Sequence, residues 1–261
     1  MLVTSRYAEL AQTLWDELAD FPVAHAEQAL HFLQERICGV MGAQNACWIG
    51  AVRISGEFPE DPVAGWRPRI VSHLHSFPEL REASRQDVKD LERGKVDLTT
   101  ARNVAGAGTF RVNRLVDLAP PEWFDSAYYR VTYRNKGHED AIWAGVPVNS
   151  DAECYFGVFR GPKAPRFSPE ERDAFGYILR ALKWFHRRLM LSHGLLIAET
   201  PPTPTERKVL HGLLTGRSEK EIAADIGQSY NTTHAHVGIL YRKFGVKNRA
   251  ALMALWISGG A

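Results

Sequence analysis

Residues 216–245 read GRSEKEIAADIGQSYNTTHAHVGILYRKFG, and this stretch determines how the C-terminal part of the chain folds. An S-x-x-E capping box at Ser218 begins a short helix. Gly227 then supplies a tight turn, because the left-handed backbone conformation costs glycine little. Ser229 caps a further helix, which ends before Gly245. The stretch therefore predicts two helices joined by a tight turn.

The second of these helices has two distinct faces. Thr233, Val237, Leu240 and Phe244 recur at spacings of four, three and four residues and predict one buried stripe. The opposite face carries small and hydrogen-bonding residues, which is typical of a recognition helix that enters the major groove of DNA. The residues predicted to contact DNA are Lys220, Ser229, Tyr230, Asn231, Thr232, His234, Ala235, Gly238, Arg242 and Lys243.

Two further helices, over 206–214 and about 248–256, complete a four-helix module. Residues 201–261 carry eight basic and four acidic side chains, although the whole chain has a net charge of only +2. A small basic module on a near-neutral body favours a polyanionic partner, here an operator in double-stranded DNA.

Four segments of this module, in order and without a gap, resemble the DNA-binding domain of the LuxR/FixJ transcription regulators: TPTERKVL at 203–210, GRSEKEIA at 216–223, TTHAHV at 232–237 and LYRKFGV at 240–246. The resemblance implies a four-helix domain whose third helix reads DNA. It also implies a cytoplasmic homodimer under the control of an N-terminal sensory domain, with RNA polymerase as a further partner. The fourth helix, with Leu252 and Trp256, is then a candidate dimer contact.

Three residues depart from the usual pattern of that family or from good helix composition. Thr233 stands where valine is usual, and its hydroxyl is predicted to bond the carbonyl four residues back. His234 replaces a lysine, so that DNA binding is expected to depend weakly on pH. Gly238 inside the helix costs about 1 kcal/mol relative to alanine, which suggests close approach of the DNA backbone or a helix that becomes firm only when bound.

The preceding three quarters of the chain predict an α+β domain. Helical periodicity covers 5–20 and 24–40, strand pairs are expected over 46–54 with 68–75 and over 141–148 with 153–160, and a helix is expected over 84–93. A capping box at Ser168 begins a helix predicted to run to about 192. Three prolines in ETPPTP at 199–204 predict a stiff linker. The predicted domains are 1–198 and 205–261.

The end of this first domain resembles a GAF-type sensor, through DAIWAGVPV at 140–148, CYFGVFR at 154–160 and FSPEE at 167–171. The resemblance implies a GAF/PAS-like antiparallel sheet with a ligand pocket on one face. The pocket candidates are Trp48, Trp123, Tyr128, Tyr133 and Trp143, with plain core packing as the alternative. Quorum-sensing relatives bind acyl-homoserine lactones through Trp, Tyr and Asp contacts, which Trp123, Tyr128, Tyr133 and Asp140 resemble loosely.

The long helix carries apolar residues at spacings of three and four, which is the pattern of a coiled-coil seam. These residues are Phe175, Ile178, Leu182, Phe185 and Leu189. They predict a dimer contact, and burial of the same stripe within one domain is the alternative.

Other classes of protein are disfavoured. No stretch approaches the roughly 18 uncharged apolar residues of a membrane helix, and 1–20 carries charges where a signal peptide is apolar. We therefore expect a cytoplasmic protein without membrane contact. Three widely spaced cysteines suggest no disulfide framework, and no catalytic constellation, metal site or cofactor motif is recognised. The sequence predicts a DNA-binding regulator, not an enzyme; the alternatives are an acyl-homoserine lactone receptor, or a ligand-binding protein whose helical module binds a protein partner.

Overall fold

The computed structural model describes residues 5–54, 60–196 and 202–257, and the chain divides into two compact units. The first unit comprises the described residues of 1–16 and 31–183, and the second those of 17–30 and 184–261. The second unit thus takes in segments that the sequence analysis assigned to the sensor domain. Residues 199–201 of the predicted linker lie outside the described residues, and Pro204 is already the first residue of a helix.

The first unit is built on a five-stranded antiparallel sheet with the order β2-β1-β5-β4-β3. Its strands are β1 (Asn45–Arg53), β2 (Trp66–His73), β3 (Arg111–Arg114), β4 (Asp140–Pro147) and β5 (Ala152–Arg160). Both predicted strand pairs are confirmed. Strand β3 was not predicted, because four residues with no apolar alternation carry too little strand signal.

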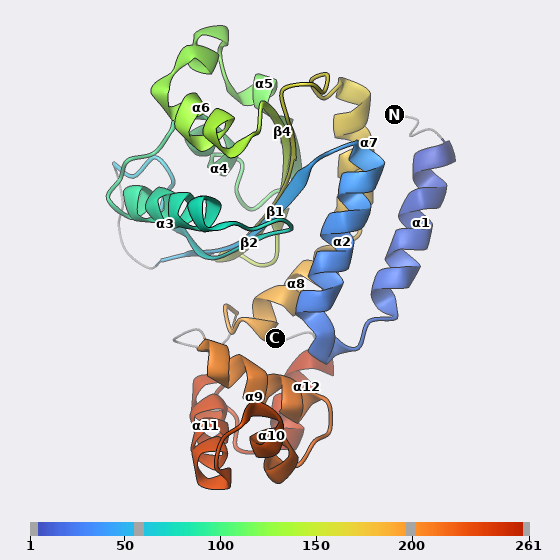
Figure 1. The fold of residues 1–261 in the computed structure, drawn as a ribbon, viewed down its shortest axis with the longest axis vertical. Helices are drawn as coiled ribbons and strands as arrows, with labels where there is room; N and C mark the ends of the chain where they lie inside the picture. Colours follow the sequence, from blue (N-terminus) through green and yellow to red (C-terminus); the bar gives the residue numbers. More distant parts are fainter. Residues whose placement is uncertain (1–4, 55–59, 197–201, 258–261) are drawn as a thin grey trace. The chain divides into compact units, whose positions relative to one another are not determined.

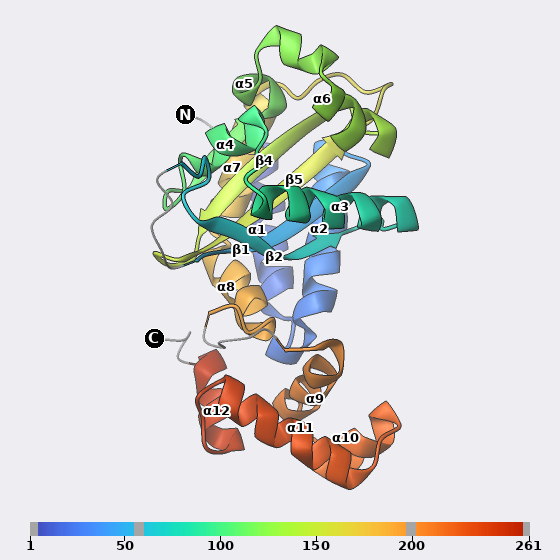
Figure 2. The same ribbon diagram turned by 90° about the vertical axis from the view of Figure 1, so that its left-hand side faces the viewer.

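Helices cover both faces of this sheet. The helices that contribute residues to this unit are α1 (Ser5–Ala19), α2 (Ala26–Met41), α3 (Pro78–Glu92), α4 (Leu98–Val104), α5 (Leu115–Leu118), α6 (Ala127–Thr132) and α7 (Pro169–Arg180). Helix α8 (Lys183–Ser192) follows and belongs, except for its first residue, to the second unit. Short 3-10 turns lie at η1 (Val23–His25), η2 (Pro121–Asp125) and η3 (Arg134–Lys136). Figures 1 and 2 show α3, α4 and α6 on one face of the sheet, and α2 and α7 on the other.

Two segments of the middle third differ from the prediction. Helix α3 begins at Pro78, six residues before the predicted start, because proline suits the first turn of a helix. Helix α4, over Leu98–Val104, was not predicted from the sequence. Asp97 caps α4 by accepting a hydrogen bond from the Thr99 amide at 2.8 Å, and an aspartate at this position is a local signal for the start of a helix.

Alternation along the strands gives the two sheet faces different roles, because successive side chains point to opposite sides. Trp48 of β1 and Phe156 of β5 are fully buried, and the Phe156 ring lies 6.2 Å from that of Phe175 on α7. Cys47 and Ile49 of β1 point to the other side, toward α3. One face is therefore sealed by helices, and the other is available to line a cavity.

Arg160, at the end of β5, connects the sheet to helices α2 and α7. Its guanidinium donates to the Met41 carbonyl and to the Glu171 carboxylate, both at 2.6 Å, and lies over the Phe167 ring. Glu171 also accepts from the Ser168 amide, so the predicted capping box at the start of α7 is confirmed. Burial opposes ionisation of Glu171, but its bonds from Arg160 and Ser168 lower its pKa overall.

The predicted long helix is wrong, since it is interrupted after Arg180 and resumes at Lys183. At the break the Leu182 amide bonds the Leu179 carbonyl, a tighter turn than that of an α-helix. The five side chains of the predicted seam are at most 3% exposed within this one chain: Phe175, Ile178, Leu182, Phe185 and Leu189. The stripe therefore packs inside the chain and offers no surface to a second copy in this conformation.

The second unit contains the predicted four-helix module, formed by α9 (Pro204–Leu214), α10 (Glu219–Ile226), α11 (Tyr230–Lys243) and α12 (Arg249–Ile257). Gly227 follows α10 with a φ of 66°, which is the predicted left-handed turn. The Ser229 hydroxyl accepts from the Thr232 amide at 3.1 Å and caps α11. The core of the unit is Leu191, Val209, Leu210, Leu213, Ile222, Val237, Leu240, Phe244, Leu252 and Trp256.

A substitution at Gly157 of β5 can test how tightly side chains pack on the cavity side of the sheet. A Cβ added there would lie 2.6 Å from the Trp143 ring, so Gly157→Ala forces the ring away and should destabilise the protein by about 1–3 kcal/mol. The measurement is urea unfolding followed by tryptophan fluorescence. Gly39→Ala in α2 is the control, because no atom lies within 4 Å of its added Cβ. Equal stability of the two variants would contradict the close packing.

Candidate functional site

Helix α11 has the two faces that its sequence predicts. The stripe of Thr233, Val237, Leu240 and Phe244 is at most 2% exposed. The predicted DNA-contacting residues that are exposed are Lys220, Ser229, Tyr230, Asn231, Thr232, His234, Ala235 and Arg242, and Gly238 is half-buried. One side of this helix-turn-helix therefore presents polar and small residues to solvent.

His234 is held in place on the exposed face. Its Nδ1 lies 2.8 Å from Oε2 of Glu219 at the start of α10, and its ring stacks on Tyr230 at 6.0 Å between centroids. The imidazole thus links the two helices of the motif.

Lys243, a predicted DNA contact, forms an ion pair within the second unit. Its ammonium group donates to Oε2 of Glu206 on α9 at 2.7 Å, and the Glu206 side chain is only 6% exposed. Burial opposes ionisation of Glu206, but the bonds from Lys243 and Thr203 lower its pKa overall. Because this partly buried ion pair holds α9 against α11, Lys243 is a structural residue in this conformation.

The expected hydrogen bond of the Thr233 hydroxyl is not formed. Its Oγ1 is buried and has no hydrogen-bond partner among the described residues. A buried hydroxyl without a partner costs about 1–3 kcal/mol, because it has given up its bonds to water.

Thr233→Val should therefore raise the free energy of unfolding by about 1 kcal/mol, since it replaces the hydroxyl with a methyl group of similar size. Urea unfolding of the full chain followed by circular dichroism measures the change. Thr232→Val is the matched control: the Thr232 hydroxyl is exposed and lies 2.8 Å from that of Ser229, so no gain is expected. A loss of stability in Thr233→Val would mean that the hydroxyl has a partner.

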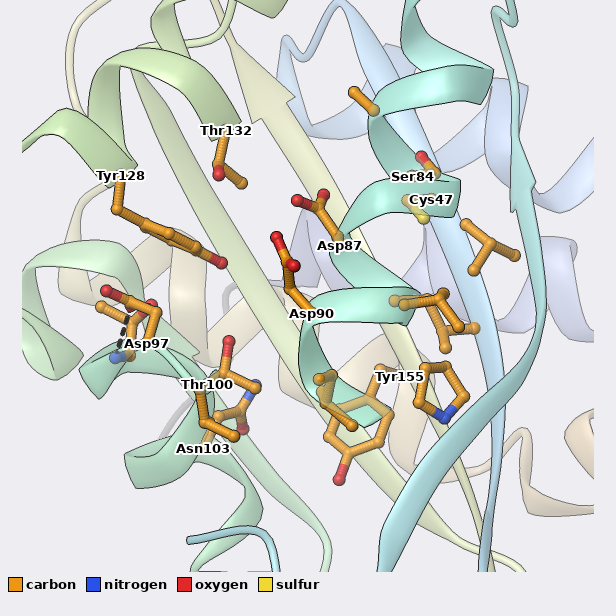
Figure 3. A pocket seen from close by; sticks show the side chains of 18 of the residues that line it. Cys47, Ser84, Asp87, Asp90, Asp97, Thr100, Asn103, Tyr128, Thr132 and Tyr155 are labelled. Atoms are coloured by element: carbon orange, nitrogen blue, oxygen red, sulfur yellow. Dashed lines mark hydrogen bonds between the residues drawn. The ribbon is translucent and has the colours of Figure 1, made fainter. Parts of the chain in front are cut away.

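A cavity of about 770 Å³ lies on the open face of the sheet of the first unit. Its floor consists of strand residues, and its walls come from α3, α4 and α6 (Figure 3). The apolar lining includes Cys47, Ile49, Ala51, Val63, Trp66, Val71, Leu80, Val88, Leu91, Val104, Val131, Trp143 and Phe159. Its size and largely apolar lining are those of a small-molecule site.

Polar groups are concentrated on the helical side of this cavity. Figure 3 shows Asp87 and Asp90 projecting from α3 toward Tyr128 and Thr132 of α6. The Tyr128 hydroxyl hydrogen-bonds with the side chains of Thr100 and Thr132. Burial, together with the charges of Asp87 and Asp97, raises its pKa. The cavity thus has an apolar floor and a polar, acidic wall.

Three of the five predicted pocket aromatics line the cavity: Tyr128, Tyr133 and Trp143. Trp48 does not, because alternation along β1 turns it to the sealed face. Trp123 lies behind the lining, where its Nε1 donates to Oδ2 of Asp97 at 2.9 Å. Asp140, a candidate for lactone contact, is also absent from the lining, since its Oδ2 accepts from the Phe167 amide at 2.6 Å.

Other lining residues escaped the sequence analysis, among them Trp66, Tyr155, Asp87, Asp90 and Asp97. Two signals were available. Tyr155 shares its strand face with Phe159, two positions of alternation further on, and Asp87 and Asp90 are three residues apart on one helix face. That these faces meet across a cavity depends on the tertiary fold and not on local pattern.

Two histidines at one end of the cavity, the half-buried His73 and the buried His138, are held in neutral form. His73 Nε2 lies 3.0 Å from the Ser84 hydroxyl, and His138 stacks on Phe159 at 4.4 Å. Burial lowers the pKa of each from 6.5 to about 4, and the charge of Lys136 contributes to both shifts. Both imidazoles are therefore uncharged at neutral pH.

Because the unfolded chain protonates these histidines near pH 6.5 and the folded chain only near pH 4, stability should fall as pH drops through that window. The loss approaches about 1.4 kcal/mol per pH unit for each histidine well inside the window. Urea unfolding at pH 7, 6 and 5 measures it, above the range in which carboxylates dominate. His138→Phe should flatten this dependence, whereas the exposed His31→Phe should not. An unchanged slope in His138→Phe would contradict the burial of a neutral imidazole.

Neither a metal site nor a membrane-spanning helix is found in the described part of the chain. No group of three or more His, Cys, Asp or Glu residues there is arranged to hold a metal ion. Among the helices of residues 5–54, 60–196 and 202–257, none is long and apolar enough to cross a bilayer.

Comparison with known proteins bears first on the second unit. Residues 202–256 match the family described as bacterial regulatory proteins of the luxR family. Over 56 residues the chain is 45% identical to the probable transcriptional regulatory protein SgaR of Hyphomicrobium methylovorum. That match covers 22% of this chain and 26% of SgaR, so it concerns the helix-turn-helix module alone.

The whole chain is similar in fold to SdiA. A structure of SdiA in complex with octanoyl-rac-glycerol aligns with 100% of this chain and 98% of its own, with a TM-score of 0.50 and 15% identity. A crystal structure of Escherichia coli SdiA aligns over 97% of both chains, with a TM-score of 0.50 and 13% identity. At this identity the similarity is one of fold. The family match identifies residues 202–256 of this chain as a LuxR-type helix-turn-helix domain.

Proposed function

We propose that this protein is a DNA-binding transcription regulator whose first unit binds a small molecule and thereby controls DNA binding by the second. The observation that carries the proposal is the exposed polar face of α11, set in a helix-turn-helix of LuxR type. The cavity on the open face of the sheet supplies the sensory half. The chain acts by binding, without catalysis, resident cofactor or metal ion.

The DNA contacts divide by chemistry. Lys220 and Arg242 are exposed cations that can meet phosphates, whereas Asn231 and His234 present hydrogen-bonding groups suited to base edges. Ser229, Tyr230, Thr232 and Ala235 surround them. An added Cβ at Gly238 would meet only Arg242, at 3.8 Å, so the fold itself does not require glycine there. This supports the prediction that the DNA backbone approaches Gly238 closely.

For the ligand, the SdiA structure with octanoyl-rac-glycerol offers a guide, since that protein has a similar fold. We infer that the cavity of this chain takes a small amphipathic molecule, with its apolar part on the strand floor. Specific recognition of an acyl-homoserine lactone finds less support, because Trp123 and Asp140 lie outside the lining. The resemblance of the first unit to GAF-type sensors in particular stays a prediction.

Dimerisation is part of the proposal, because helix-turn-helix proteins commonly bind two half-sites. Its surface is not the apolar stripe of α7 and α8, which is buried within the chain. On α12, Leu252 and Trp256 are also buried, and Met253 is exposed. A contact through α12 would therefore use its outer face. Contact with RNA polymerase and a cytoplasmic location complete the proposal.

Two single variants of the full chain test the division of DNA contacts. Lys220→Ala should weaken binding to all DNA sequences and reduce the slope of affinity against salt by about one, because a phosphate contact acts through counterion release. Asn231→Ala should cost about 1–3 kcal/mol on the preferred sequence and little on random DNA. Fluorescence anisotropy at several salt concentrations measures both. Lys163→Ala, an exposed cation of the first unit, is the control.

Equal losses on preferred and random DNA for both variants would contradict the division into phosphate and base contacts. Absence of any salt-dependent DNA binding by the full chain would favour the alternative in which the helical module binds a protein partner.

A further inference from the structure

The acidic wall of the cavity is only partly neutralised. Asp87 is paired with Lys136, whose ammonium group lies 3.1 Å from Oδ2. Asp90 accepts from the Gln86 amide at 2.9 Å, and Asp97 accepts from Thr99 and from Trp123. All of these latter donors are uncharged. Within the described residues, Asp90 and Asp97 thus have hydrogen bonds but no ion pair.

The other cations of the lining do not offset these two carboxylates. Arg67 forms an ion pair with Asp61 at 2.8 Å, and Asp61 is not part of the lining. Lys95 is exposed, so its ammonium group remains hydrated. His73 and His138 have pKa values lowered to about 4 and so add no positive charge at neutral pH. The wall that faces α6 therefore carries net negative charge.

Aromatic rings surround the same space. Those in the lining are Trp66, Tyr128, Tyr133, Trp143, Tyr155 and Phe159. The faces of aromatic rings attract cations, and pockets lined with aromatic side chains recognise organic ammonium groups. Carboxylates together with ring faces favour a cation more strongly than either does alone, because both present negative potential to the ligand.

We propose that the cavity selects an organic cation: a molecule with an apolar body, seated on Ile49, Val71 and Trp143, and an ammonium group directed at Asp90 and Asp97. This inference deepens the proposed function, since it names the chemical class of the ligand of the same cavity. Anionic ligands are disfavoured, because Lys136 is already paired with Asp87. The carboxylate of such a ligand would lie near Asp90 and Asp97 without a cation to pair with.

The preference for a cation can be tested with three probes that share an eight-carbon chain and differ in the polar end group. We would measure the affinity of the full chain for n-octylamine, n-octanol and octanoate by isothermal titration calorimetry at neutral pH and moderate salt. The amine should bind at least about tenfold more tightly than octanoate, which corresponds to about 1.4 kcal/mol, with the alcohol between them. The common alkyl chain keeps the apolar contribution constant, so the differences report on the head group.

Asp90→Asn identifies the group responsible. It keeps the size of the side chain and removes its charge, and Asp90 caps no helix, unlike Asp97. We expect amine affinity to fall about tenfold while that for octanol is unchanged. Glu92→Gln is the matched control, because Glu92 lies on the same helix, pairs with Arg69 at 3.2 Å and is outside the lining. It should leave all three affinities unchanged.

Several outcomes would overturn the proposal. These are octanoate binding as tightly as the amine, an unchanged amine affinity in Asp90→Asn, or the absence of binding by all three probes. Affinity for DNA is measured separately on the same preparations without any probe. If the chain binds DNA but does not prefer the amine, the ligand class is wrong and the DNA-binding function stands. If it prefers the amine but does not bind DNA, the ligand class stands and the DNA-binding function is wrong.

Discussion

The alternation of side chains along β1, β4 and β5 is the constraint on which the first unit depends. It directs Trp48 and Phe156 into the layer below α2 and α7, and Ile49, Trp143 and Phe159 to the opposite side. A shift of one residue in register would exchange these two sets, so that the side chains now packed under α2 and α7 would point into the cavity. The hydrophobic core and the cavity are thus two results of a single register.

The sequence predicted the helical module well because its determinants are local. Capping residues, turn glycines and the stripe from Thr233 to Phe244 each act within a few positions, and the structure has all of them. It was less informative about side chains that meet across helices. Lys243 was predicted only as a DNA contact, and its ion pair with the buried Glu206, 37 residues earlier in the chain, was not foreseen.

In the first unit, strand pairing followed from pattern, but the cavity did not. Its walls come from α3, α4 and α6, and the Asp90 and Tyr128 side chains face it only because the fold places these helices over the sheet. Apolar periodicity alone left two interpretations of the α7 and α8 stripe, and burial within the chain decides between them. Aromatic residues such as Trp123 were similarly ambiguous, because core and pocket residues share one composition.

The central claim is that the exposed face of α11 reads a DNA sequence. Selection of duplexes from a random pool by the purified full-length protein, followed by sequencing of the bound fraction, tests it most directly. The account predicts enrichment of a defined motif that binds at least about a thousandfold more tightly than random DNA. Recovery of a pool without any enriched motif, or no retention of DNA at low salt, would contradict it.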